Sequence, residues 1–508
     1  MPAPVEPVSV VEYGARRTII VIGIMMAALL QTLDATIVNV ALPTIEGNVG
    51  AAIDDGTWII TGYIISNVVA IPLAPFFLQR FGRRAYYSAC IIGFTIASML
   101  CGTATDLWTL VGFRIVQGAF GGGLIATSQI ILRDTFPPEK FGAAAALFAI
   151  ALTFGPALGP TLGGILTDAY SWQWVFFINL VPGTLAAIII LTMLRNPTAP
   201  RRMPFDAPGL ALLITALGSL QFALDEGERY DWFSDSRIVI ASAGFVFGLA
   251  AFIVWELFGT KTPIVDLRIF RHRNVRFGTL AAIVIGMVLF GPTIILPQYV
   301  QAILGFTSTL SGLLILMRAL PVLLLTPLVA RLASTTDFRV MLASGYAISA
   351  VSFVILASHM TSQSDFGSFA WVLAGSGVGQ SMLLVPLLVG MISSVPPLDA
   401  PKVSSFISLS VQTGGSIAST MLVTIFDRRT YFHSDILRGN VSLAHRGLLQ
   451  SAHVSFPALV RLVRQQAANS GFADAILALA PLACLGVVLA LCLRRNKTAA
   501  PVAAVAAE

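Results

Sequence analysis

Charged residues are scarce in this chain of 508 residues: only 11% are Asp, Glu, Lys or Arg, whereas 56% are hydrophobic. A soluble domain typically carries about 25% charged residues. The deficit excludes an ordinary water-soluble protein and indicates that lipid covers most of the surface. The net charge of +6 does not indicate nucleic-acid binding, because the basic residues fall in short loops between apolar segments, as they do in membrane proteins.

Cysteine and catalytic signatures are scarce too. The four cysteines lie in apolar segments and show neither the spacing of zinc ligands nor a disulfide framework. The sequence has no Walker A motif for ATP, no HExxH motif and no GxSxG motif. We therefore predict that the protein is not an enzyme, that it uses no cofactor or metal, and that an ion gradient supplies its energy.

Long apolar segments, in contrast, are abundant. A transmembrane helix needs about 20 mainly apolar residues, and fourteen segments have this length: 18–42, 57–79, 86–104, 107–132, 142–166, 174–194, 208–225, 237–257, 277–302, 308–331, 339–358, 368–393, 403–426 and 473–493. The first follows two arginines but has no cleavage pattern, so we predict a retained helix and not an export signal. The predicted fold class is an all-α integral membrane protein.

The loops between these segments alternate in charge. Nearly all Lys and Arg residues of the short loops fall on the side that both termini share, and the opposite short loops hold only Arg229 and Arg237. Basic loops tend to remain in the cytoplasm. We therefore predict that both ends of the chain, residues 1–17 and 494–508, are cytoplasmic.

Two features lie on the predicted outer side. Residues 427–472 are too polar to span the bilayer, and the stretch 456–468 has helical periodicity. This helix either lies on the membrane or contacts a partner protein; the alternative is a plain connector. An acidic cluster either attracts cations or forms a solvated loop, which we favour. Its residues are Asp225, Glu226, Glu228, Asp231 and Asp235.

Two similar basic turns indicate an internal repeat. Residues 77–84 close the second apolar segment and residues 329–339 close the tenth, each after a proline-containing helix. If 208–225 and 237–257 are an insertion, the other segments divide into six plus six, as expected of an alternating-access transporter with its site between the halves. The predicted units are an N-terminal half (18–200), two inserted helices (201–260) and a C-terminal half (261–493).

A carboxylate lies in the middle of the first apolar segment. A charge there costs roughly 2.5 to 3.5 kcal/mol on insertion scales, so we expect Asp34 to face a cavity and to act. Desolvation favours the protonated acid, which suits a proton carrier. Gln31, one turn earlier on nearly the same face, is its expected hydrogen-bond partner. The alternative is a structural Asp that caps a kinked segment or pairs with a buried Arg.

A buried arginine lies in the fourth segment. Gly118 and Gly122 have the spacing of close helix contacts, and Gly121 shares with Gly118 the face of Arg114, so a neighbouring backbone or carboxylate can approach the guanidinium. Arg114 is either a fixed positive charge that acts on Asp34 or on interior water, or an architectural Arg bound to carbonyl groups. The sequence leaves both alternatives open.

Arg318 is the comparable buried charge of the second half, and the sequence offers it no intramembrane acid. It either binds a substrate carboxylate or has a structural role, which we favour. Uncharged polar residues of the apolar segments either line a cavity for a bulky, mostly apolar solute or join helices to one another. With Arg318, the candidate cavity residues are Gln31, Asn67, Gln298 and Gln412.

Residues 155–164 contain four glycines and two prolines within an apolar segment. Each would cost roughly 1 to 3 kcal/mol inside a helix in water, but a membrane bundle tolerates them because neighbouring helices satisfy the freed backbone groups. We predict a bent, closely packed helix that acts as a hinge and seal between the halves. The candidate hinge residues are Gly155, Pro156, Gly159, Pro160, Gly163 and Gly164.

Several motifs in this order resemble the major facilitator superfamily, and within it the fourteen-helix drug:proton antiporters of the EmrB/QacA type. Residues 33–43 resemble the first-helix motif, whose acid is associated with proton coupling. Arg114, Gln117 and Gly118 fit the RxxQG motif of the fourth helix, and residues 155–164 fit the antiporter motif gxxxGPxxGG. Two flanking stretches, 138–142 and 171–183, are similar to those of the EmrB group. The resemblance covers essentially the whole chain.

The chain departs from this pattern after the second helix. The family motif there is G-x-L-x-D-R-x-G-R-R. This chain has Pro75 where the motif has Gly and Gln79 where it has Asp, so the charge interaction of that Asp is not expected here. The remaining motif residues are the expected cytoplasmic gate: Arg80, Gly82, Arg83 and Arg84.

The resemblance implies a proton-coupled multidrug efflux antiporter that exports hydrophobic small molecules, cationic ones included, across a bacterial inner membrane. Asp34 would bind a proton from outside and release it inside. An alternative is a dedicated proton-coupled exporter of an endogenous metabolite, such as a siderophore, a fatty acid or another organic anion. A non-transporting membrane sensor or scaffold is an alternative of a different class. The resemblance also implies a periplasmic adaptor protein and an outer-membrane channel as partners, with 427–472 as the candidate contact.

Overall fold

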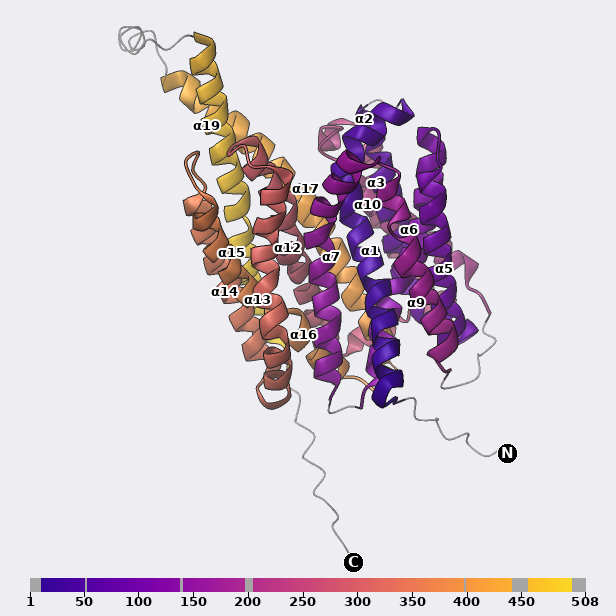
Figure 1. Cartoon of the computed structure of the whole chain (residues 1–508). Coiled ribbons are helices and arrows are strands. Elements are labelled where there is room, and N and C mark those ends of the chain that lie inside the picture. The colour runs from indigo at the N-terminus through magenta and orange to yellow at the C-terminus, as the bar shows by residue number, and fades with distance from the viewer. Residues whose placement is uncertain are drawn as a thin grey trace, which may run out of the picture.

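The computed structural model describes residues 11–50, 53–137, 140–196, 204–396, 399–440 and 456–495, and these residues form helices and no strands. The helices lie side by side in a bundle whose long axes run in one general direction (Figure 1). The all-α fold class is therefore confirmed. Parts of the predicted cytoplasmic ends (1–10 and 496–508), of the flanking stretch 138–142, of the insertion and of the outer segment (441–455) lie outside the described residues.

The first part of the chain forms the following helices. They are α1 (Gly14–Val49), α2 (Ile53–Gly56), α3 (Trp58–Ala70), η1 (Ile71–Leu73), α4 (Ala74–Phe81), α5 (Arg83–Gly102), α6 (Leu107–Thr135), α7 (Phe141–Ala169), α8 (Trp174–Phe177), α9 (Leu180–Met193), α10 (Ala207–Glu226), η3 (Trp232–Ser234), α11 (Ser236–Val254) and η4 (Trp255–Gly259).

The second part begins at η5 (Leu267–Arg271). It continues with α12 (Arg273–Ala302), α13 (Ser308–Thr335), α14 (Phe338–His359), α15 (Phe366–Ser381), α16 (Leu384–Ile392), α17 (Ala400–Asn440), α19 (Phe456–Leu477) and α20 (Leu479–Cys492).

Fourteen helical segments of the described chain are long and apolar enough to cross a membrane, which confirms the predicted number. Several of these segments are interrupted. The second consists of α3, η1 and α4, and the interruption coincides with Pro72 and Pro75, which lack the backbone N–H that a continuous helix requires.

The helices before and after the α10–α11 pair gather in two groups that meet along α7 (Figure 1). In the first group α7 packs on α1 and α3 packs on α6, and in the second α12 packs on α17. The two groups contact each other where α7 packs on α13 and on α16. The division of the chain at 200 and 260 stays a prediction.

The described residues of the segment 427–472 differ from the predicted loop with one separate helix. Its first arm continues α17, which is 41 residues long, and its second arm is the start of α19. A helix of that length measures about 60 Å, roughly twice the hydrocarbon thickness of a bilayer. The two arms pack together and are joined by Asp474, which contacts Arg429 Nε at 2.5 Å and His433 Nε2 at 2.8 Å. They form a helical hairpin at one end of the bundle (Figure 1).

Candidate functional site

Asp34 of α1 lies at the centre of a fully buried polar cluster. Its Oδ2 atom accepts a hydrogen bond of 2.6 Å from Arg114 Nη1 of α6. Its Oδ1 atom accepts from Gln117 Nε2 at 2.9 Å and from Asn179 Nδ2 at 3.0 Å. Asp34 is 0% exposed and Arg114 1% exposed. An ionised carboxylate can only accept hydrogen bonds, and the three donors around Asp34 suit such a group.

Arg114 is held from several sides. Its Nε donates to the carbonyl oxygen of Ile59 at 3.2 Å, and its Nη1 also donates to Gln117 Oε1 at 2.8 Å. The guanidinium lies 4.0 Å from the ring centroid of Tyr63, within the range of a cation–π interaction. Arg114 therefore makes both kinds of contact that the two alternatives require: it pairs with Asp34 and it binds a backbone carbonyl of α3.

The sequence did not identify Asn179 as a site residue. Its amide bridges Asp34 and Ser98 Oγ, the latter at 3.0 Å, and so ties the cluster to α5. The sequence feature that could have indicated Asn179 is an amide side chain near the start of the apolar segment 174–194. The predicted partner Gln31 was wrong: its Oε1 atom is buried and has no hydrogen-bond partner among the described residues, and its backbone oxygen accepts from Tyr63 at 3.5 Å.

The helix with the Gly/Pro motif, α7, presents glycines to α1 at every fourth position. A Cβ atom at Gly155 would collide with Thr32 Oγ1 and lie 2.9 Å from the backbone nitrogen of Leu33. At Gly159 it would collide with Thr36 Oγ1. We call Gly155, Gly159 and Gly163 the glycine face. It contacts the turns of α1 on either side of Asp34, so α1 and α7 touch backbone to backbone at the site; Gly164 is buried in the same helix.

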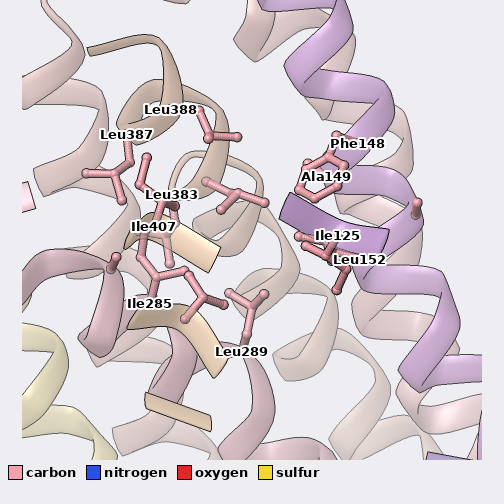
Figure 2. Packing of buried hydrophobic residues seen from close by; sticks show 14 of the residues in the cluster. Ile125, Phe148, Ala149, Leu152, Ile285, Leu289, Leu383, Leu387, Leu388 and Ile407 are labelled. Atoms are coloured by element: carbon pink, nitrogen blue, oxygen red, sulfur yellow. The ribbon is translucent and has the colours of Figure 1, made fainter. Parts of the chain in front are cut away.

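The opposite side of α7 faces the second group of helices. A side chain at Gly312 of α13 would collide with Thr161 Oγ1, and Pro156 lines a small cavity together with Leu289, Arg318 and Gln380. Figure 2 shows the apolar contact beside it. There the α7 side chains Phe148, Ala149 and Leu152 face residues of α12, α16 and α17, among them Ile285, Leu289, Leu387, Leu388 and Ile407.

Arg318 of α13 binds backbone rather than an acid. Its Nη2 donates to the carbonyl oxygen of Val288 at 2.6 Å and its Nη1 to that of Leu289 at 2.9 Å, both in α12. Its Nε is buried and has no hydrogen-bond partner in the part of the chain that the structure describes. These backbone contacts are compatible with the structural role that we favoured, and Arg318 also lines the cavity.

The other predicted cavity residues do not line this cavity. Asn67 is buried and donates to the carbonyl oxygen of Gly118 at 3.5 Å, so it joins α3 to α6 across the glycines of the fourth segment. Gln412 is partly buried in α17, and Gln298 is exposed on α12.

The predicted cytoplasmic gate forms a junction of helix ends. Gly82 has a φ of 80°, which glycine adopts without strain. Arg83 donates from Nε to the carbonyl oxygen of Arg195 at 2.6 Å and pairs with Asp134 at 3.3 Å. The backbone nitrogen of Arg84 donates to Asn196 Oδ1 at 3.0 Å. The turn therefore ties α5 to the ends of α6 and α9; Arg80 lies over the ring of Phe81.

The acidic cluster that we expected to be a solvated loop is partly buried, which corrects that prediction. Glu226 is 1% exposed and pairs with Arg229 at 3.0 Å. Asp225 has an inaccessible Oδ2 atom. Both belong to the last turn of α10, whose side chains α3 and α17 cover, whereas Asp231 is exposed.

Comparisons with known proteins agree with this architecture. The family model of the Major Facilitator Superfamily matches residues 24–419. The multidrug export protein EmrB of Escherichia coli (strain K12) is 36% identical over 84% of this chain and 84% of its own length. The fatty acid resistance protein FarB of Neisseria gonorrhoeae is 36% identical over 83% of each chain.

Among solved structures, the human organic anion transporter MFSD10 superposes with a TM-score of 0.60 at 14% identity, covering 93% of this chain and 99% of that one. This likeness shows the fold alone. The sequence matches confirm the resemblance drawn from the motifs. The chain belongs to the Major Facilitator Superfamily, a family of transporters, and within it to the fourteen-helix group that includes EmrB.

Proposed function

We propose that this protein is a proton-coupled antiporter that exports hydrophobic small molecules, cationic ones among them, across a bacterial inner membrane, with both termini in the cytoplasm. The observation that carries the proposal is the buried Asp34–Arg114 pair, which contacts the glycine face of α7 through neighbouring turns of α1. The similarity to the multidrug export protein EmrB supports drugs as the cargo.

In the proposed cycle, a proton from the outer side binds Asp34. The neutral acid no longer attracts Arg114, so the guanidinium keeps its contacts with Gln117 and the Ile59 carbonyl while α1 is released. Thr32 and Thr36, which flank Asp34 on α1, touch the glycine face, so a shift of α1 also shifts α7. Loss of the proton to the cytoplasm restores the pair.

In this proposal, α7 transmits the shift of α1 to the second group of helices. Because α7 touches α13 at Thr161 and Gly312 and lines the cavity beside Arg318, it is the proposed hinge and seal. The junction of Arg83 with Asp134 and the Arg195 carbonyl keeps the ends of α5, α6 and α9 together, so we propose that they move as one unit when the cytoplasmic gate opens.

The test is drug efflux from proteoliposomes under an imposed proton gradient. Asp34→Asn keeps the size of the side chain but cannot carry a proton, so it should abolish gradient-driven efflux. The matched control is Asp231→Asn, which changes an exposed acid and should transport like the wild type. Undiminished efflux by Asp34→Asn would exclude this carrier role, and the absence of any solute counterflow by the wild type would favour a sensor or scaffold.

A second candidate cargo is a fatty acid or another organic anion. Arg318 supports it, since this buried cation lines the cavity between the helix groups and its Nε has no hydrogen-bond partner among the described residues. FarB is also named for fatty acid resistance. Efflux of a labelled fatty acid that Arg318→Lys weakens, with drug efflux unchanged, would favour this cargo. Competition between the fatty acid and a cationic drug would indicate one shared path.

We also propose that the hairpin of α17 and α19 contacts a periplasmic adaptor that leads to an outer-membrane channel. The support is its length beyond a bilayer and the Asp474 contacts that join its arms. Shortening residues 427–472 by whole helical turns should abolish co-purification with the adaptor while proteoliposome efflux continues. Unchanged co-purification would exclude the hairpin as the contact.

A further inference from the structure

Asp225, in the last turn of α10, is a second carboxylate at a helix interface, and no basic residue pairs with it in the described chain. Three other acids at helix contacts do have such a partner: Asp34 pairs with Arg114, Glu226 with Arg229, and Asp134 with Arg83. The carboxyl group of Asp225 therefore has no ion-pair partner among the described residues, and its Oδ2 atom is inaccessible to solvent.

Neutral groups from three helices surround this carboxyl group. Oδ1 accepts from Gln221 Nε2 at 2.8 Å and from Ser416 Oγ of α17 at 3.4 Å. Gln221 Nε2 also donates to Ser416 Oγ at 2.5 Å, and the buried Thr61 of α3 lies beside the carboxyl group. Oδ2 is inaccessible and accepts no hydrogen bond from any described residue, which leaves one oxygen free to hold a proton.

The local charges disfavour an anion at this position. The last turn of a helix carries a partial negative charge on its free carbonyl groups, and Glu226 is adjacent. Of the packed helices, α3 has no charged residue, and α17 contributes Asp427, which lies near Glu228. Of the cations near this end, Arg229 contacts Glu226 and Asp55, and Arg237 of α11 lies over the ring of Tyr230. In α17, Arg429 pairs with Asp474 and Arg428 is exposed.

The position of Asp225 connects it to movement. The helix α10 packs on both α3 and α17, so Thr61 and Ser416 reach one carboxyl group from the two helix groups. We propose that Asp225 is a second proton-binding site, and that its occupancy is linked to opening of the seam between α3 and α17. If opening the seam changes the proton affinity, binding a proton must change the opening equilibrium by the same factor.

Proton binding by Asp225 is independent of the proposed function, whereas its part in coupling rests on that function. The test of binding is infrared difference spectroscopy of the purified protein during a pH titration. We expect a C=O stretching band of a buried, protonated carboxyl group that disappears as the pH rises. The band should lose intensity in Asp225→Asn relative to the wild type and keep its full intensity in Asp34→Asn and in the exposed control Asp231→Asn. Unchanged band intensity in Asp225→Asn would overturn the assignment.

A variant that keeps the acid gives the second measurement. Ser416→Ala removes a donor that favours the ionised form, so the midpoint of the band should move to higher pH. An identical band midpoint in Ser416→Ala and the wild type would overturn the proposed environment of the site. Ser416→Ala also tests proton binding by Asp225 if Asp225→Asn does not fold.

The linkage is tested by distance measurements between spin labels at the exposed residues Asn48 and Tyr431, with the accessible native cysteines replaced. The distance should change with pH in the wild type and not in Asp225→Asn, whereas Asp231→Asn should behave as the wild type. A change that survives in Asp225→Asn would overturn the linkage. If efflux did not depend on the proton gradient while the distance still depended on Asp225, the proposed function would be refuted and the linkage of Asp225 to opening would stand.

Discussion

Pro292 of α12 deprives the carbonyl oxygen of Val288 of its helical donor, and Arg318 of α13 supplies a replacement at 2.6 Å. Proline has no backbone N–H, so the oxygen four residues earlier in a helix has no partner. In the membrane interior, water cannot fill that position. The arginine thus satisfies a backbone group that the proline leaves without a donor.

This relationship predicts that the two residues are energetically coupled. Arg318→Met should lower the free energy of unfolding by about 1 to 3 kcal/mol, the cost of a buried acceptor left without a donor. In a Pro292→Ala background the same change should cost less, because residue 292 then donates to Val288. The measurement is denaturant unfolding in detergent micelles. Pro297→Ala is the matched control, since it supplies a backbone donor to a different carbonyl oxygen, that of Thr293. Equal coupling with both alanines would contradict the proposed link between Arg318 and Pro292.

The pair of Asp34 and Arg114 predicts a second coupling. Removing one partner of a buried ion pair costs about 3 to 5 kcal/mol because the other charge is left uncompensated. Arg114→Met should therefore destabilise the fold strongly, and adding Asp34→Asn should recover part of the loss. A double-mutant cycle on the unfolding free energy measures this. Additive losses, within about 0.5 kcal/mol, would show that the two side chains do not stabilise each other.

Some of this site followed from the sequence because a charge inside a membrane is expensive. That cost identified Asp34, Arg114 and Arg318 from their position alone. Asn179 was not identified for the opposite reason. Burying an uncharged amide costs little free energy, so amides occur at many helix contacts and the presence of one does not specify its partner. Gln31 failed because sharing a helix face with Asp34 does not determine which neighbouring helix reaches the carboxylate first.

The predicted outer side was harder to derive from the sequence, because a polar residue is not always an exposed one. Asp225 and Glu226 occur in an acidic stretch, and only the packing of α10 against α3 and α17 buries them. The arms of the hairpin are too polar to look like spans, yet they continue α17 and α19 because helix pairing, and not lipid, covers their inner faces. The fourteen spans were predictable because length and hydropathy alone determine them.

The turn between α13 and α14 predicts a pH dependence of stability. Hydrogen bonding by Arg339 holds the pKa of Asp337 below its ordinary value of 3.8, and the two residues pair at 2.7 Å. A lowered pKa in the folded state contributes stability above the ordinary pKa that is lost as the pH falls through the folded pKa. Asp337→Asn keeps a residue that caps α14 well, so it should remove mainly the charge.

We therefore expect Asp337→Asn to be less stable than the wild type near about pH 7 and to approach it as the pH falls to about 3. Arg339→Gln removes the partner and should show the same convergence. Unfolding in detergent at a series of pH values checks both variants. A stability difference that stays constant with pH would mean that the ion pair makes no contribution.

The glycine face of α7 predicts a graded and partly reversible effect of added methyl groups. Gly159→Ala places a Cβ against Thr36 Oγ1, with the backbone nitrogen of Ile37 at 3.1 Å, whereas at Gly163 the nearest atom is the backbone oxygen of Ile37 at 2.7 Å. Both changes should push α1 away from α7 and reduce gradient-driven efflux. Thr36→Ala should restore much of the activity of Gly159→Ala, because it removes the side chain in the way, and little of the activity of Gly163→Ala.

The control for this series is Gly112→Ala, at a position of α6 where no atom lies within 4 Å of the added Cβ, and it should transport normally. Efflux and substrate binding are measured side by side in proteoliposomes. Loss of efflux with retained binding would indicate that close contact of α1 and α7 serves coupling, since the glycine face touches α1 beside Asp34 and not the cavity near Arg318. Equal rescue of both glycine variants by Thr36→Ala would contradict this geometry, because no side chain of residue 36 obstructs position 163.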